Sequence, residues 1–442
     1  MTTKTALFVI GVFELTASAA LAQNKPETPS ASTKFDAKLY GFVELDGISD
    51  STRSFNDGAG NAGIARSGTL AGDHARLQSS IRNSRFGIKL SGPSSDDIKT
   101  SAMLEMDFFG NQPPNASEAA FFNNPTMRVR HAMLKLETPF VDVLAGQYWE
   151  LFGWQSYFHP NTVEIQGVPG QVYSRTTQLR LSHTFKTEPV NVELAVAAAR
   201  PLSRDTALPD GQGGLRLMLN GWKGLHTSGA TGTAIDALAI GVSGLVRQFK
   251  VVEFSDKPQA ERTKGGAGLS IDALVPLIPA TDKQRGNALT LTASFVKGAG
   301  IADEYTGLTG GIGFPALPNP SAASPAPTYT PNIDPGLVTY GQNGALHAIE
   351  WQSFIAGLQY YLPPSGSVWV SANVSQMKSG NIASWGDHTK VFTDSLWADG
   401  NLFWDINAAM RAGAEYAYFQ QKYADDQKVH NHRVQLSAFY IF

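Results

Sequence analysis

Apolar and polar residues alternate along most of this chain with a period of two. The stretch DIKTSAMLEMDFFG shows the pattern most clearly: one parity holds Ile98, Ala102, Leu104, Met106 and Phe108, and the other holds Lys99, Ser101, Glu105 and Asp107. Successive side chains of a strand point to opposite faces, so each such segment predicts a strand with one apolar face. About sixteen segments of this kind follow one another, most of roughly 9 to 14 residues, a length that suits strands tilted across a bilayer.

The connections between these segments are of two kinds. Tight turns such as GPSSDD, TPF, KTEP, LPPSG and DINA alternate with long, polar, glycine-rich segments near residues 51–75, 110–125, 149–173, 298–346 and 379–393. A sandwich gives no reason for every second connection to be short, whereas a membrane barrel has short periplasmic turns and long extracellular loops. We therefore predict an all-β, transmembrane antiparallel β-barrel of about sixteen strands. The connection around Gly224–Thr233 is longer than this scheme expects, and the proline-rich run Phe314–Pro331 predicts an irregular surface loop.

The C-terminal segment fits the closing strand of such a barrel. In RVQLSAFYIF, the apolar parity is Val434, Leu436, Ala438, Tyr440 and Phe442. An open sheet edge cannot be satisfied in lipid, so the last strand should pair with the first, and both termini should be periplasmic. Tyr440 and Phe442 would then belong to the aromatic girdle at the bilayer interface.

The N-terminal segment is typical of an export signal. A positive start at Lys4 precedes an apolar stretch from Ala6 to Leu21 and an A-x-A site at Ala20–Ala22. The apolar stretch is too short to favour a membrane anchor. We predict a signal peptide at 1–22, a periplasmic linker at 23–36 and a barrel domain at 37–442.

Composition removes several classes of protein. With no cysteine, the chain can form neither a disulfide framework nor a thiolate metal site. The net charge of −3 and a pI near 6.3 give no case for nucleic-acid binding. Beyond the signal, no apolar run is long enough for a transmembrane helix. The 43 glycines and 24 phenylalanines suit turn-rich β structure.

Nothing in the sequence points to catalysis. No G-x-S-x-G motif follows a predicted strand, and we expect neither an enzyme nor a bound cofactor. His430 and His432 could offer two metal ligands, but at a solvated junction with no evident third ligand they do not predict a metal site.

Charges on the predicted strands offer a candidate site. Arg85, Arg128, Arg130 and Arg180 fall on the second, fourth and sixth predicted strands. An arginine at the bilayer midplane costs about 2–4 kcal/mol, so these side chains should face the lumen. There they could either pair with Glu105 and Asp107 as part of a structural polar wall or contact passing solutes.

The segment between the fifth and sixth predicted strands supplies the second half of this candidate site. Its formal charges before Arg175 are Glu150 and Glu164. If the segment enters the lumen, these acids opposite the arginines would set a transverse field at the constriction. The alternative is a surface loop whose aromatic residues pack on its own rim.

Several segments resemble a known family. SRFGIKL, MLEMDFFGN and MRVRHAMLKL, followed by VDVLAGQYWELFGW, resemble Gram-negative trimeric outer-membrane porins, especially the DcaP-like group. GAEYAYF and HRVQLSAFYIF resemble the last hairpin of these porins, and the terminal Phe is similar to the signal read by the barrel assembly machinery. The resemblance implies a homotrimer, a third loop folded into the lumen, and small dicarboxylates as solutes. The helical periplasmic extension of the DcaP-like group has no counterpart here, where a short linker stands before Lys38.

These observations predict an outer-membrane porin with a water-filled channel for small hydrophilic solutes, including anions such as small carboxylates. Its expected partners are outer-membrane lipid, lipopolysaccharide, the solutes and two further copies of the chain. Two other classes stay open: a soluble secreted β-sheet binding protein and an outer-membrane barrel hydrolase.

Overall fold

The computed structural model describes residues 34–442, apart from 59–62, 96, 111–124, 166, 202–205, 230, 256–257, 282–283, 306–307, 314–332 and 342. The expected signal peptide, nearly all of the linker and the proline-rich run therefore lie outside the described residues.

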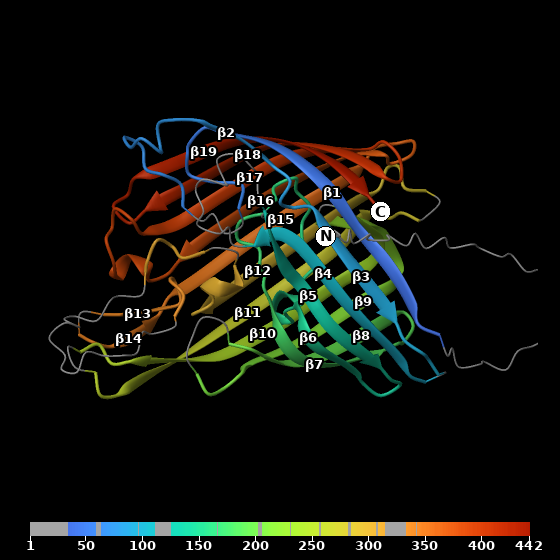
Figure 1. Cartoon of the computed structure of the whole chain (residues 1–442), viewed down its shortest axis with the longest axis horizontal. Helices are drawn as coiled ribbons and strands as arrows, with labels where there is room; N and C mark the ends of the chain where they lie inside the picture. The colour runs from blue at the N-terminus through green and yellow to red at the C-terminus, as the bar shows by residue number, and fades with distance from the viewer. Residues whose placement is uncertain are drawn as a thin grey trace, which may run out of the picture.

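The described chain is one antiparallel barrel (Figure 1). Its strands are β1 (Asp36–Asp50), β2 (Arg76–Ser80), β3 (Arg85–Ser91), β4 (Lys99–Gly110), β5 (Thr126–Glu137), β6 (Asp142–Trp149), β7 (Arg175–Phe185), β8 (Val190–Ala199), β9 (Asp210–Ser228), β10 (Gly232–Val252), β11 (Glu261–Ile278), β12 (Leu289–Ala299), β15 (Glu350–Tyr361), β16 (Val368–Ser379), β17 (Phe392–Asp405), β18 (Met410–Tyr423) and β19 (Lys428–Ile441). The connecting segments contain the small hairpin β13 (Val338–Tyr340) and β14 (Leu346–Ala348) and the 3-10 turns η1 (Phe152–Trp154), η2 (Ala302–Glu304) and η4 (Ile382–Ser384).

Strands β2 and β3 are two halves of one wall strand. Both pair with β1: β2 pairs with its residues Asp46–Asp50, and β3 pairs with its residues Asp36–Phe42. The break between them brings Ser84 to the backbone of Glu44, whose amide donates to the Ser84 hydroxyl over 2.9 Å. Counted as one strand, they complete a barrel of sixteen strands, as predicted.

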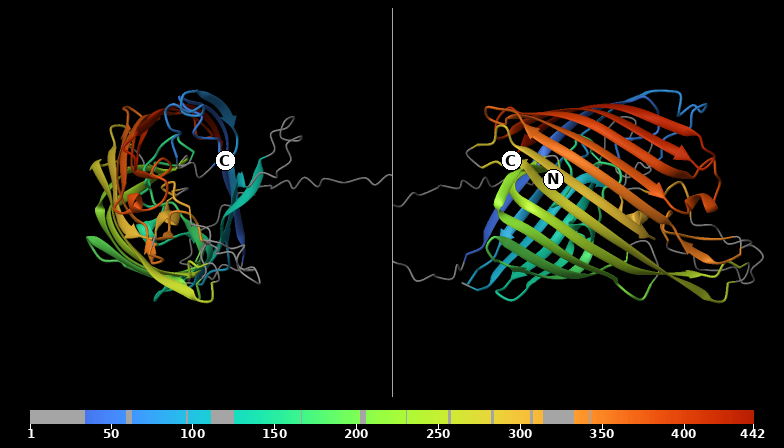
Figure 2. Two further views of the ribbon diagram at one scale, coloured as in Figure 1. Left: turned by 90° about the vertical axis from the view of Figure 1, so that its left-hand side faces the viewer. Right: turned by 180° about the vertical axis from the view of Figure 1, so that it is seen from behind.

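The barrel closes between its first and last strands. β1 and β19 pair antiparallel from Phe42↔Ile441 to Asp50↔Arg433, so no sheet edge is left open at this seam. The end-on view shows the strands as a ring around chain that lies inside it (Figure 2). The prediction of a closing C-terminal strand is confirmed.

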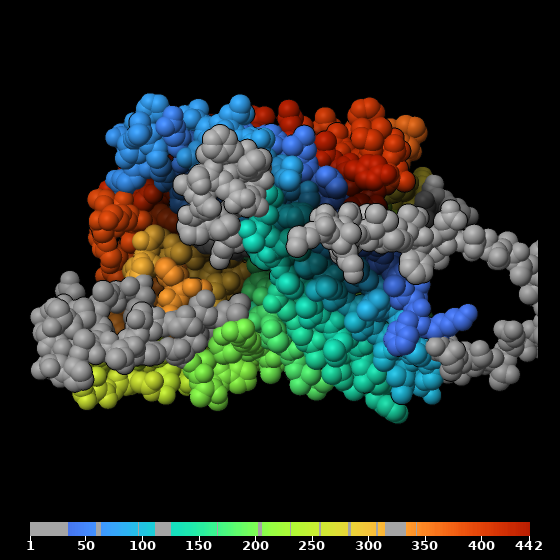
Figure 3. Space-filling model, in the orientation of Figure 1, coloured from blue at the N-terminus to red at the C-terminus, as the bar shows by residue number. Residues whose placement is uncertain are grey.

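The predicted parity of the strands is also confirmed. On β19, Val434, Leu436 and Tyr440 are 47%, 60% and 55% exposed on the outside, whereas the inward Gln435 is 0% exposed. Phe439 departs from the polar parity because its ring packs inside, edge-on to Phe42 at 6.1 Å. Exposed apolar side chains such as Leu134, Leu179 and Val196 lie on the outside of β5, β7 and β8, strands that form the cyan to green part of the surface in Figure 3.

The two ends of the barrel differ as the connection lengths predicted. The short turns after β3, β5, β7, β15 and β17 gather at the end that also holds Asp36 and Phe442. The long connections after β1, β6, β12 and β16 lie at the other end, together with three shorter ones, after β8, β10 and β18. No described helix is long and apolar enough to cross a membrane.

The interior is not uniformly polar. Residues of the connection between β12 and β15, including Ile301, Tyr305, Leu337 and Ile349, pack with inward side chains such as Trp351 in one buried apolar cluster. This packing fills part of the barrel and leaves the polar space of the lumen between the remaining walls.

Candidate functional site

The segment between β6 and β7, here called the inner loop (residues 150–174), folds into the barrel. It enters through η1, where Gly153 has φ 77°, a conformation that favours glycine. Its backbone then forms hydrogen bonds with β9 and β10, here called the far wall. The amide of Leu151 donates to Gln212 Oε1 over 2.9 Å, and the amide of Gly153 donates to Ser243 Oγ over 2.7 Å. The alternative of a loop packed on its own rim is therefore wrong.

The second half of the inner loop crosses to the strands near the seam. The carbonyl of Asn161 accepts from Ser371 Oγ at 2.9 Å and from Asn373 Nδ2 at 2.7 Å. The carbonyl of Val163 accepts from Gln435 Nε2 at 3.1 Å. A buried loop is stable only if its backbone polar groups find partners, and inward side chains of six strands, β9, β10, β16, β17, β18 and β19, provide them.

Three of the four predicted arginines gather on the wall formed by β3, β4 and β5. Arg130 Nε lies 2.7 Å from Glu105 Oε1, and its Nη1 lies 3.0 Å from Asp107 Oδ2. Arg128 pairs with Asp107 at 2.7 Å, and Arg85 lies 3.8 Å from Glu105. This group, here called the arginine wall, unites five of the eight predicted site residues.

The arginine wall carries more positive than negative charge. Besides its three arginines, Lys89 lies over the Tyr40 ring at 4.8 Å, and Arg175 lies over the Trp149 ring at 4.7 Å. Five cations thus accompany two carboxylates, Glu105 and Asp107. Lys89 shares the parity of Arg85 and could have been found from the sequence, whereas Arg175 begins a strand at the loop junction and gives no such signal.

Two inner-loop side chains, Tyr173 and His159, have shifted pKa values. Burial alone would raise the pKa of Tyr173, but the nearby Arg130, Arg175 and Arg85 outweigh it and lower that pKa to about 7. Burial, together with the neighbouring His226, lowers the pKa of His159 to about 3, so this imidazole is neutral at physiological pH.

Of the remaining predicted residues, Arg180 and Glu150 lie apart from the arginine wall, whereas Glu164 lines the same cavity as Arg85 and Arg130. Arg180 donates to Gln178 Oε1 over 3.1 Å and to the carbonyl of Trp149. Glu150 accepts from Ser174 Oγ of the inner loop at 2.8 Å and from Gln212 Nε2 of the far wall, and burial raises its pKa. Glu164 forms an ion pair with Arg433. The inner loop therefore does not present both acids to the arginines.

Further carboxylates face the lumen from wall strands: Glu415 and Asp399 from β18 and β17, and Asp46 from β1, the strand that pairs with β3. Glu415 accepts from the amide of Glu164 at 2.8 Å, and Asp399 accepts from Asn373 Nδ2 at 2.7 Å. Asp46 accepts from Gln435 Nε2 at 3.1 Å. Asp399 and Glu415 were missed because each is a single carboxylate with no charged residue next to it in the sequence to draw attention to it. Only the period-two parity of β17 and β18 indicates that they face inward.

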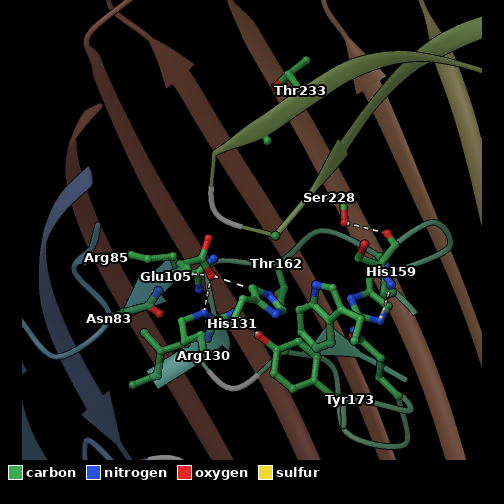
Figure 4. Close-up of a pocket in the computed structure, with 18 of the residues that line it drawn as sticks. Asn83, Arg85, Glu105, Arg130, His131, His159, Thr162, Tyr173, Ser228 and Thr233 are labelled. Carbon is green, nitrogen blue, oxygen red and sulfur yellow. Dashed lines mark hydrogen bonds and ion pairs between the residues drawn. The ribbon is translucent and has the colours of Figure 1, made fainter. Parts of the chain in front are cut away.

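A cavity of about 440 Å³ lies between the arginine wall, the inner loop and the hairpin of β9 and β10. Its lining includes Arg85 and Lys89 of β3, Glu105 of β4 and Arg130 of β5. The inner loop contributes a second side, and the hairpin of β9 and β10 contributes a third through Ser228 and Thr233 (Figure 4). A small polar solute in this cavity would face three cations, Arg85, Lys89 and Arg130, together with the carboxylates of Glu105 and Glu164, aromatic rings and uncharged hydroxyls.

Neither a family model nor a curated protein sequence matches this chain. Solved structures match its fold, and they are porins and channels of the outer membrane. The outer membrane channel DcaP of Acinetobacter baumannii is similar at a TM-score of 0.63 and 18% identity, over 92% of this chain and 97% of that chain. OmpF of Salmonella typhi, in complex with daunomycin, is similar at a TM-score of 0.51 and 9% identity, over 92% and 97%. The chain therefore has the fold of an outer-membrane porin, and its resemblance to the DcaP-like group is confirmed for the fold.

Proposed function

We propose that this protein is a porin of the Gram-negative outer membrane through which small hydrophilic solutes diffuse passively, with a preference for anions such as small carboxylates. The observation that carries the proposal is the charge surplus of the arginine wall beside a polar cavity. The outward apolar positions of the strands fit contact with hydrocarbon and with lipopolysaccharide at the outer rim.

Conduction requires binding that is favourable but weak. A cation in a wet pore attracts a carboxylate through charge-assisted hydrogen bonds, while water and salt keep that attraction small enough for release. Arg85 and Lys89 suit this role because they line the cavity and are less enclosed by carboxylates than Arg130 is. In this proposal the lumen residues serve solute passage and not catalysis.

The two cavity cations provide the test. The double variant Arg85→Gln, Lys89→Gln should shift the reversal potential in a planar bilayer with a salt gradient toward cation preference. Lys186→Gln, in an exposed periplasmic turn away from the cavity, is the matched control and should keep the wild-type value. Wild-type selectivity in the double variant would mean that the arginine wall is structural.

A further inference from the structure

The hairpin of β9 and β10 does not end at the barrel rim. Its pairing passes from Leu219↔Leu238 directly to Lys223↔Ala237, so Asn220–Trp222 stand opposite no residue of β10. Such a bulge at a barrel rim bends the strand and redirects the chain beyond it. Residues Lys223–Ala237, on the far side of the bulge, are here called the inner hairpin, and they include the connection that is too long for a periplasmic turn.

The inner hairpin turns into the barrel and packs there. Leu225, His226 and Thr227 are at most 2% exposed. Gly224 comes so close to the wall that a Cβ atom on it would lie 2.5 Å from Pro276 Cβ. This close approach requires glycine at the point where the hairpin bends inward.

Wall strands hold the inner hairpin as they hold the inner loop. The Gln359 side chain accepts from the amide of Thr227 and donates to its carbonyl, both over 2.9 Å, which replaces a missing strand neighbour. Thr290 Oγ1 donates to the carbonyl of Leu225 over 2.7 Å. Both backbone groups of Thr227 are thereby satisfied inside the lumen.

The inner hairpin and the inner loop also bind each other. Ser228 Oγ donates to the carbonyl of Ser156 over 3.0 Å, and His226 Nε2 lies 3.1 Å from the carbonyl oxygen of His159. Asn161 Nδ2 donates to the carbonyl of Gly229. The inner loop and the inner hairpin therefore form one connected structure across the lumen. The two segments enter the lumen from opposite ends of the barrel.

We infer that the inner hairpin is a second constriction element, which limits the size of the solutes that the arginine wall selects by charge; this inference rests on the proposed function. Its residues Ser228, Gly229, Gly232, Thr233 and Ala234 line the same cavity as Arg85 and Arg130 (Figure 4). They are small and uncharged, so they can narrow the path and form hydrogen bonds without changing the charge preference.

Shortening the hairpin tests this inference. Replacing Asn220–Ala237 by an Asn-Gly turn joins Leu219 to Leu238, where the wall pairing ends, in a preferred two-residue hairpin. The single-channel conductance of the shortened porin should rise at least about twofold, because the narrowest width of the pore controls passage. In liposome-swelling assays the shortened porin should also admit larger uncharged sugars. Its reversal potential should stay close to the wild-type value.

A cysteine variant tests the same inference without disturbing assembly. The chain has no cysteine, so Ser228→Cys introduces a unique thiol into the cavity lining. A bulky methanethiosulfonate reagent should then reduce the current through open channels. Lys186→Cys, exposed in the turn between β7 and β8, is the control and should show no loss of current.

The outcomes separate the two proposals. If the wild-type protein conducts neither ions nor sugars, the proposed function fails. If it conducts, but the reacted Ser228→Cys channel keeps its full current, the inner hairpin does not constrict the path and this inference alone is overturned. That conclusion holds even if the shortened hairpin fails to fold, and a shortened barrel with wild-type conductance would overturn the inference equally.

Discussion

Gly41 and Phe442 exchange both of their backbone hydrogen bonds. The Gly41 amide donates to the Phe442 carbonyl over 2.9 Å, and the Phe442 amide donates to the Gly41 carbonyl over 3.0 Å. The final residue of the chain thus completes the seam between β1 and β19, while its ring is 48% exposed on the outside of the barrel. One residue contributes both to closure and to the aromatic girdle.

Deleting Phe442 should therefore lower the amount of folded barrel. The deletion removes two seam hydrogen bonds and an interfacial ring, and an unpaired edge is costly in lipid. The measurement is the heat-modifiable, folded fraction in outer membranes on unheated gels. Phe442→Tyr, which keeps the ring and the backbone, is the control. Normal assembly of the deletion variant with altered conductance alone would contradict this role.

Arg130→Ala should destabilise the barrel by about 1–3 kcal/mol, because it removes the short ion pair of Glu105, whose remaining arginine partner Arg85 lies at 3.8 Å, and one of the two ion pairs of Asp107. Arg130 is 2% exposed and bonds to both Glu105 and Asp107. Denaturant unfolding in detergent measures the loss. Adding Glu105→Gln to Arg130→Ala should recover part of the stability, since Asp107 keeps Arg128, and a double variant as unstable as the single one would refute the charge explanation.

Acidification should loosen the inner loop through His159. Its folded-state pKa of about 3 is below the unfolded value, so the unfolded chain binds the proton first. The stability present above about pH 6.5 should fall by up to about 1.4 kcal/mol per pH unit as the pH drops toward the folded pKa. Hydrogen exchange of residues 150–174 at pH 7 and pH 5 measures this change. His159→Gln, which cannot titrate, should show a smaller difference, and an unchanged difference would exclude His159 as the source.

Gly153→Ala should weaken the entry of the inner loop by about 1–2 kcal/mol, since an L-residue at positive φ is strained. The new Cβ would also lie 3.3 Å from the Val172 side chain. Gly213→Ala, whose Cβ would meet nothing within 4 Å, is the matched control in a neighbouring wall strand. Faster hydrogen exchange in the inner loop of Gly153→Ala but not of Gly213→Ala is the expected result.

The homotrimer implied by the resemblance to trimeric porins is a prediction about the assembled protein. Native mass spectrometry in mild detergent should give about three times the mass of the mature chain, as expected for a closed symmetric assembly. Single-channel recordings should show current steps in groups of three. A monomeric mass together with solitary steps would refute the trimer.

The period-two pattern predicted the strands of the barrel wall well, because every strand must place apolar side chains toward lipid and polar side chains toward the lumen. It placed Arg85, Glu105 and Asp107 on inward positions, the cost of an arginine in lipid added Arg128 and Arg130, and these five side chains do meet. The pattern could not show where a long connection goes after it leaves the wall. Glu150 is the clearest case, since its position depends on Gln212, a distant inward residue that looks like any other polar wall position.

The inner hairpin was visible in the sequence only as an unexpected length. Its direction is set by Asn220–Trp222, whose effect depends on pairing between β9 and β10, and by Gln359, more than a hundred residues away. The short strand Arg76–Ser80 follows the predicted loop near residues 51–75 and was not predicted, because five residues are too few to show a clear alternation.

The ion pairs of Arg433 have a consequence for biogenesis. This arginine of the last strand bonds to Asp50 of the first strand at 2.8 Å and to Glu164 of the inner loop. One contact of the inner loop is thus made by the same side chain that joins the two ends of the barrel. In a precursor whose seam is still open, Arg433 would lack Asp50 of the first strand, so we expect this contact of the inner loop to weaken and the channel to be leakier than the sealed barrel.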